Sequence, residues 1–234
     1  MRKLVLGLTA AAVLATGASA ATVVSNQVLG TTATFMVGEI AGNSAQIGVD
    51  VKHSKFLKRN ENGFWTGSLD FTATQDYQSI SAPITFNFYQ DFAHKNANGF
   101  LDFTSVNVYP FVNRINNVQT NNRENFGGIG LSTNLVLQYQ NEKIADIEIG
   151  GEKSIFDKST HKYANLFVKV NVPIQDNLSA YAQIGKVFLT DKTTTTKTET
   201  IDLGGGDTTT TTVTTTEPTS TTENTFLLGI SYSF

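Results

Sequence analysis

The sequence predicts an all-β fold, in the form of a closed antiparallel barrel of about ten strands. Three observations lead to this prediction: an export leader, a series of segments in which apolar and polar residues alternate, and links between them that are short and long in turn. Abundant Gly, Thr, Asn and Phe, with only 4 prolines, favour strands and turns over helices. Barrels of eight or twelve strands also fit the pattern.

Residues 1–20 have the form of a secretory signal peptide. Arg2 and Lys3 give a charged start, an apolar stretch follows, and Ala18-Ser19-Ala20 offers small residues for cleavage. We expect the leader to be removed, which leaves residues 21–234 as one domain of barrel size. Since no later stretch approaches the roughly 18 apolar residues of a spanning helix, we expect any membrane contact to be made by strands.

The composition argues against a disulfide-stabilised domain and against a nucleic-acid-binding protein. The chain has no cysteine, so this exported domain depends on backbone hydrogen bonds and burial instead of disulfides. Its formal net charge of −3 becomes about −5 without the leader, and no basic patch indicates a nucleic-acid partner.

Six segments alternate regularly, with apolar residues on one face and polar residues on the other, as expected of strands with one apolar face. These segments are Ser44–His53, Phe64–Thr74, Ser79–Gln90, Gly128–Gln140, Ala145–Glu152 and Ala164–Val172.

Three further segments, 32–40, 99–112 and 177–190, alternate less regularly. In the second of these, Val106 and Val108 are out of step with Leu101 and Phe103. A β-bulge between the two pairs accounts for the change of phase.

The chain ends on a tenth segment, Asn224–Phe234, with a strict two-residue period. Its apolar set ends on the last residue and comprises Phe226, Leu228, Ile230, Tyr232 and Phe234. Between these residues lie mainly small or polar ones, so the pattern predicts a strand with one apolar face.

The links alternate in length through the last five strands. Short links and long links at opposite ends, with strands apolar outward and polar inward, are the arrangement of transmembrane β-barrels. The short links are 141–143 and 173–177, and the long ones are 113–125, 154–161 and 191–223. The rule weakens near the N-terminus, where 41–43 is short and 54–62 is long although the opposite is expected.

The export leader, the alternating segments and the aromatic last residue together resemble Gram-negative outer-membrane β-barrel proteins. The resemblance implies a cell outer-membrane location, short periplasmic turns and longer extracellular loops. It also implies that the final strand is an assembly signal, read by the barrel-assembly machinery after periplasmic chaperones deliver the chain. Phe226, Leu228, Ile230, Tyr232 and Phe234 match that signal.

A secreted β-sandwich is the alternative fold, with the apolar faces packed together inside. A membrane barrel instead needs aromatic belts near the strand ends. The aromatic residues at such positions are Trp65, Phe88, Tyr139, Tyr163 and Tyr232.

In a barrel, the polar faces collect charges of both signs in the lumen. Because ten strands leave little open space, we interpret these charges as a salt-bridged structural network, with a selectivity filter as the alternative. The charges expected to face the lumen are Asp50, Lys52, Asp70, Asp146, Glu148, Glu152, Lys169 and Lys186.

The stretch from Thr193 to Thr222 is rich in threonine on both sides of a glycine cluster, Gly204–Gly206. This suits either a solvated extracellular loop or a hairpin projecting from the barrel. A functional interpretation is a contact site for an extracellular ligand, or a glycan acceptor. Asp202 and Asp207 offer too few oxygens for a Ca²⁺ site.

Catalysis is not expected. The lipid A deacylases, which the chain resembles in size, use a His-x-Ser pair, and none of His53, His94 and His161 stands in that pattern. Few histidines and no cysteine also give no basis for a metal site or cofactor.

Two functions remain. The first is a surface-exposed structural or adhesion-type protein, similar to small opacity-type barrels, whose extracellular loops make the contacts. The alternative is a small porin-like channel for passive diffusion of ions or small solutes.

Overall fold

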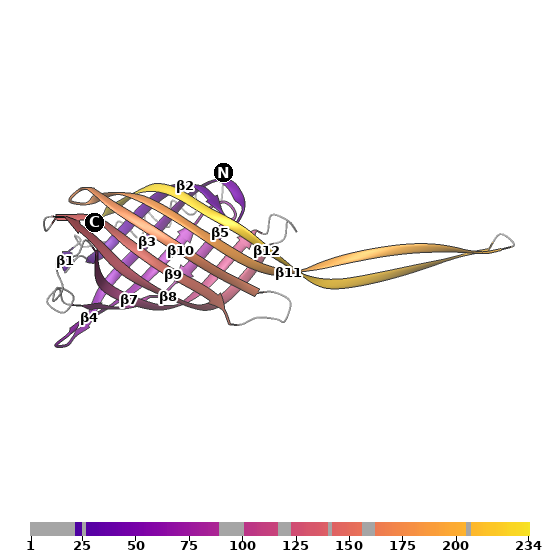
Figure 1. Ribbon diagram of the computed structural model, residues 1–234, viewed down its shortest axis with the longest axis horizontal. Helices are drawn as coiled ribbons and strands as arrows, with labels where there is room; N and C mark the ends of the chain where they lie inside the picture. The colour runs from indigo at the N-terminus through magenta and orange to yellow at the C-terminus, as the bar shows by residue number, and fades with distance from the viewer. Residues whose placement is uncertain are drawn as a thin grey trace.

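The computed structural model describes residues 22–24, 27–88, 101–116, 123–139, 142–155, 162–204 and 207–234 (Figure 1). All regular elements among them are strands: β1 (Thr22–Val24), β2 (Gln27–Ile40), β3 (Asn43–Arg59), β4 (Gly63–Ala73), β5 (Tyr77–Ser81), β6 (Ile84–Phe88), β7 (Leu101–Asn116), β8 (Arg123–Tyr139), β9 (Glu142–Ser154), β10 (Lys162–Gln175), β11 (Leu178–Gly204) and β12 (Asp207–Ser233). No helix in the described part of the chain is long and apolar enough to cross a bilayer. The leader expected at residues 1–20 lies outside the described residues.

Ten strand positions close into a barrel. From β2 onward each strand pairs antiparallel with its neighbours around the ring, and β12 pairs with β2 to complete it. β5 and β6 occupy one position, since both lie between β4 and β7. β1 only forms a short hairpin with β2. The predicted closed antiparallel barrel of ten strands is confirmed.

The strand predicted as continuous over 79–90 is interrupted in the structure. β5 ends at Ser81 and β6 begins at Ile84, with Ala82 and Pro83 between them. Proline has no N–H to give to a neighbouring strand, so the ladder breaks there. The carbonyl of Pro83 still accepts a hydrogen bond from the Ser68 N–H at 2.8 Å, which keeps the two halves in line.

The bulge predicted in β7 is present. The register with β8 shifts between Phe103 and Ser105, so one extra residue, Thr104, lies on β7. Its hydroxyl donates to the Asn134 carbonyl at 3.1 Å. The shift moves Val106 and Val108 out of phase with Phe103, as the sequence pattern indicates.

The two ends of the barrel differ. At the termini end, β2 begins, β12 ends and a two-residue turn, Asp176–Asn177, joins β10 to β11. At the hairpin end, β11 and β12 run on past the other strands into a projecting two-stranded hairpin (Figure 1). The β2–β3 turn at this end is tight, with Ala41 and Gly42 at φ 49° and 77°. This pair of positive angles is typical of a type I′ turn.

The expectation of a long link over 54–62 is wrong. β3 continues to Arg59, and only residues 60–62 connect it to β4. The turn is held by the Asn60 side-chain oxygen, which accepts the N–H groups of Asn62 and Gly63, both at 3.0 Å. The sequence pattern does not indicate a strand there, because apolar and polar residues stop alternating once neither face of the strand is buried.

The barrel is apolar outside and largely polar inside. Exposed large apolar side chains occur on strands all around the ring, for example Phe35 (55 %), Leu131 (58 %) and Ile184 (55 %). Their sequence neighbours Thr34, Ser132 and Gln183 line the interior. This is the inverse of a soluble domain, in which apolar faces are the buried ones.

Candidate functional site: a filled lumen and a projecting hairpin

A polar cavity of about 280 Å³ occupies part of the barrel interior. Of the eight charges expected in the lumen, seven line it: Asp50, Lys52, Asp70, Asp146, Glu148, Glu152 and Lys169. They come from β3, β4, β9 and β10, which lie on different parts of the ring, so closure of the barrel is what brings them together.

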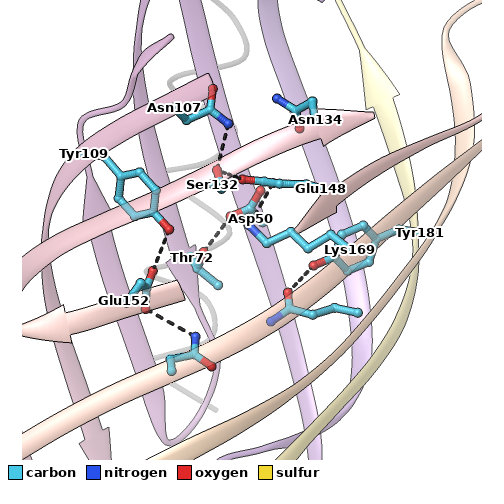
Figure 2. A network of polar contacts seen from close by, with 12 residues as sticks. Asp50, Thr72, Asn107, Tyr109, Ser132, Asn134, Glu148, Glu152, Lys169 and Tyr181 are labelled. Atoms are coloured by element: carbon cyan, nitrogen blue, oxygen red, sulfur yellow. Dashed lines mark hydrogen bonds and ion pairs between the residues drawn. The ribbon is translucent and has the colours of Figure 1, made fainter. Parts of the chain in front are cut away.

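Glu148 is the centre of one polar network (Figure 2). One carboxylate oxygen accepts a 2.6 Å hydrogen bond from the Ser132 hydroxyl, which in turn accepts from the Asn107 side chain at 2.8 Å. The other oxygen lies 3.5 Å from the Lys169 ammonium. The Lys169 ammonium also lies 4.8 Å from the centre of the Phe167 ring, so one cation serves a carboxylate and an aromatic face.

Glu152 is the centre of a second network. Tyr163 donates its hydroxyl to this carboxylate at 2.7 Å and Tyr109 does so at 3.4 Å. The amide groups of Asn165 and Asn113 also donate to it, at 3.3 and 3.4 Å. Four donors from β7 and β10 converge on one carboxylate, so they cross-link strands without a cation.

Toward the hairpin end the interior becomes apolar. The buried cluster there combines residues of β2, β10, β11 and β12 with residues of β7 and β8, which lie across the ring. Its members are Met36, Ile40, Ala41, Tyr109, Phe111, Ile115, Phe126, Tyr163, Val187, Leu189 and Leu227. Side chains from opposite sides of the wall therefore meet and fill the lumen.

Sequence reasoning missed this cluster because it assigned one polar face to each strand. A signal was present, since Phe226-Leu227-Leu228 and Val187-Phe188-Leu189 are runs in which both faces are apolar. In such a run the second face must be covered too, and here it is covered by the opposite wall.

Lys186 does not face the lumen, so that expectation is wrong. Its side chain is exposed, whereas the next residue, Val187, is buried in the apolar cluster. Lys186 shares the outward phase of Ile184 and Phe188, which are exposed by 55 % and 40 %. Strand alternation sets this orientation, because inward Gly185 and Gln183 fix the phase of β11.

Tyr163, expected in an outer aromatic belt, also faces the other way. It is only 2 % exposed and packs against Phe111 and Phe126 with ring centres 5.6 and 5.3 Å apart. The outward neighbour on β10 is Ala164, which pairs with Phe188.

An outer aromatic cluster does occur at the termini end. Trp65 packs on Phe86 at 4.8 Å between ring centres, Phe86 on Phe88 at 5.0 Å, and Phe88 on Phe103 at 5.3 Å. On β12, Tyr232 and Phe234 contact each other at 5.0 Å.

The predicted assembly residues form one row on the outer face of β12. Their exposed fractions range from 37 % at Phe234 to 53 % at Ile230. Leu227 and Ser231 between them are buried. The row comprises Phe226, Leu228, Ile230, Tyr232 and Phe234.

At the hairpin end the outer face changes from apolar to charged. On β2 the exposed Val37 is followed by Glu39, and on β7 the exposed Val112 is followed by Arg114. Further exposed charges at this level are Lys153, Lys162 and Lys186. The apolar surface is therefore a belt with a polar boundary.

The Thr-rich stretch is a hairpin, with β11 and β12 paired residue by residue from Leu178↔Tyr232 to Asp202↔Thr208. β10 pairs with β11 only as far as Thr190, and β2 pairs with β12 only from Phe226 onward. Between these limits neither strand pairs with a described strand other than its partner in the hairpin. The side chains of 196–200 and 209–215 are exposed.

Of the three histidines considered as candidate catalytic residues, His53 is the one that lies within the described residues. His53 is hydrogen bonded to the Thr31 hydroxyl at 2.9 Å through Nδ1, while His94 and His161 lie outside the described residues. Within the described ranges, no three His, Cys, Asp or Glu side chains are grouped so that they could hold a metal ion.

Comparisons with protein-family models, with curated proteins and with solved structures found no match. The functional argument therefore depends on the barrel itself.

Proposed function

We propose that this protein is an outer-membrane β-barrel that anchors a surface-exposed hairpin, and that it serves as a structural or adhesion-type protein of the cell surface. The observation that supports this most is the continuation of β11 and β12, in unbroken register, well beyond the strands that flank them (Figure 1). A long, exposed element on a closed and filled barrel suits contact with an external partner.

The outer surface supports the membrane part of the proposal. A continuous apolar surface of this kind is unfavourable in water but matches the hydrocarbon of a bilayer. Aromatic rings such as Trp65 and Tyr232 lie at one limit of the belt, and charges such as Arg114 and Lys186 lie at the other. Closure of β12 on β2 leaves the wall without an unpaired edge, as a bilayer requires.

The ends of the barrel suggest its orientation. Outer-membrane barrels keep both chain ends in the periplasm, together with mostly short turns. At the termini end β2 begins and β12 ends, and the links 60–62, 140–141 and 176–177 are short, whereas 89–100 is longer. The hairpin then projects outside the cell. In this proposal the leader directs export, and the row from Phe226 to Phe234 engages the barrel-assembly machinery.

A porin-like channel is the alternative function. The polar cavity of about 280 Å³ favours it. The apolar cluster around Phe111, Phe126 and Leu189 favours the anchor instead, because it fills the lumen at the hairpin end.

A pair of matched substitutions tests the membrane anchor. Leu131, in the middle of β8, is 58 % exposed, and Val213, on the hairpin, is 55 % exposed. If the belt contacts lipid, Leu131→Arg lowers the free energy of unfolding from lipid vesicles by about 2–4 kcal/mol. Val213→Arg leaves it unchanged, since this residue stays in water. Equal and small effects at both positions would contradict a lipid-facing belt.

A further inference from the structure

The projecting hairpin has two edges, and both lack a neighbouring strand among the described residues. We define the free edge of β11 as the side of Asp191–Gly204 that faces away from β12. Within the described chain no strand pairs there, because β10 contacts β11 only up to Thr190. An unpaired edge presents backbone N–H and C=O groups that can bind another strand.

The register identifies the residues whose backbone groups point to this edge. The Ser233 N–H donates to the Asn177 carbonyl, so odd-numbered residues of β12 bond toward β11. The Asn224 carbonyl instead accepts from Gly42, on the β2 side. Since the pairing runs without a shift to Asp202, Thr196, Thr198 and Thr200 direct their backbone groups to the free edge.

The edge of β12 is less suited to pairing. Pro218 belongs to its even-numbered set, so this edge lacks one outward N–H. β12 also has no Lys or Arg, so two such edges cannot form ion pairs with each other. The free edge of β11 has no proline and has charges of both signs, of which Lys197 and Glu199 belong to the part whose side chains are described as exposed.

These two charges select one register. If the β11 edges of two molecules pair antiparallel about a two-fold axis at Thr198, Lys197 lies directly opposite Glu199 of the second copy, twice. Because Lys197 and Glu199 direct their own backbone groups toward β12, these are non-hydrogen-bonded pairs, where side chains lie closest. A shift of the axis to Lys197 or Glu199 would oppose like charges.

We propose that the hairpin is a homotypic adhesion element, in which the free edges of β11 from two copies join into one four-stranded antiparallel sheet. Thr196 pairs with Thr200 of the second copy and Thr198 with Thr198, so exposed threonines continue across the junction. A four-stranded sheet is also more stable in water than a two-stranded hairpin alone.

The antiparallel register places the two barrels in facing membranes. β11 runs from the barrel to the tip, so an antiparallel partner arrives from the opposite direction. The two arms overlap over about 12 residues, or on the order of 40 Å. Side-by-side barrels in one membrane would pair parallel and set Lys197 next to Lys197. Each junction is small, so adhesion depends on many copies acting together.

This inference rests on the proposed membrane anchor, and vesicles test both. Mature protein is inserted into phosphatidylcholine vesicles, heat-modifiable mobility shows that the barrel is folded, and trypsin cleavage shows that the hairpin is outside. Vesicle clustering is then followed by light scattering. Wild-type vesicles should cluster, and those with Lys197→Glu or Glu199→Lys alone should cluster about tenfold less.

Mixing the two single variants, each in vesicles with its own dye, should restore clustering in two-coloured aggregates. The reason is that one variant then presents two acidic side chains at the junction and the other presents two basic ones. The double variant, in which both charges are exchanged, should also cluster. The matched control is Glu217→Lys, a reversal on the same face but on β12, which should behave as wild type.

Dispersed wild-type vesicles with folded protein and a cleavable hairpin would overturn homotypic pairing and leave the anchor intact. Clustering of both single variants at the wild-type level would overturn the register. Vesicles that take up no folded barrel would overturn the proposed function and this inference with it.

Discussion

At the scale of single residues, the interior depends on acceptors that satisfy many donors. Glu152 accepts from Tyr163, Tyr109, Asn165 and Asn113. In Glu152→Gln one carboxylate oxygen is replaced by an NH₂ group, which cannot accept a hydrogen bond. Some of these four donors therefore lose their acceptor. We expect the free energy of unfolding in urea to fall by about 1–3 kcal/mol. Glu217→Gln on the exposed hairpin is the control and should change nothing, and an equal loss in both would contradict a structural role for the interior network.

The last residue allows a second prediction at this scale. Phe234 is 37 % exposed, and its N–H donates to the Thr31 carbonyl at 2.8 Å. If its ring is read during assembly, its deletion lowers the folded, heat-modifiable fraction in outer membranes. Ser233→Ala, one residue earlier on the other face, should leave that fraction unchanged. Normal insertion of the truncated chain would remove the assembly signal from Phe234.

Whether the sequence predicts that a residue faces the lumen or the outside depends on how regularly its strand alternates. Asp50 and Lys52 belong to a strand with strict alternation, and both line the cavity. Lys186 and Tyr163 instead lie toward the hairpin end, where both faces of a strand mix apolar and polar residues. The sequence pattern leaves the phase open at such positions, and the orientation of nearby residues in the folded strand, such as Gln183 inward and Ile184 outward, fixes it.

At the scale of elements, the hairpin should be separable from the wall. Residues 192–218 pair only with each other where the structure describes them, since β10 stops at Thr190 and β2 reaches only Phe226. Replacement of 192–218 by a two-residue Asn-Gly turn, which joins the paired residues Asp191 and Thr219, should therefore leave the heat-modifiable barrel intact. The same deletion should abolish vesicle clustering. A chain that no longer folds would mean that the threonine strands stabilise the wall.

Strand existence was predictable from alternation, whereas strand length was not. The two-residue period ends where a strand leaves the apolar belt, so the part of β3 beyond His53 and the projecting parts of β11 and β12 show no regular alternation from which a strand could be predicted. The interruption at Pro83 had a signal in the proline itself, and the bulge at Thr104 had one in the changed phase of Val106. Both are local backbone effects that sequence can report.

At the scale of the whole molecule, closure of ten strands followed from their number and alternation, but the filling of the lumen did not. The cluster joins β7 and β8 to strands across the ring. Runs with two apolar faces, such as Val187-Phe188-Leu189, indicate that the second face is covered, but they do not show which strands cover it. The size of a ten-stranded ring explains why the cluster forms, since large side chains from opposite walls can meet across it.

Because this cluster fills the lumen, we expect the barrel to be closed to ions. In a planar bilayer the mature protein should show no steady single-channel conductance, and the variant without 192–218 should be equally silent, because Val187, Leu189 and Leu227 remain in place. Replacing Phe111 and Phe126 together by serine removes the rings that pack on Tyr163 and should create openings. Reproducible openings of the unaltered protein would instead show that ions pass the cluster, which would favour the porin-like function and make Glu148 and Lys169 candidates for ion selectivity.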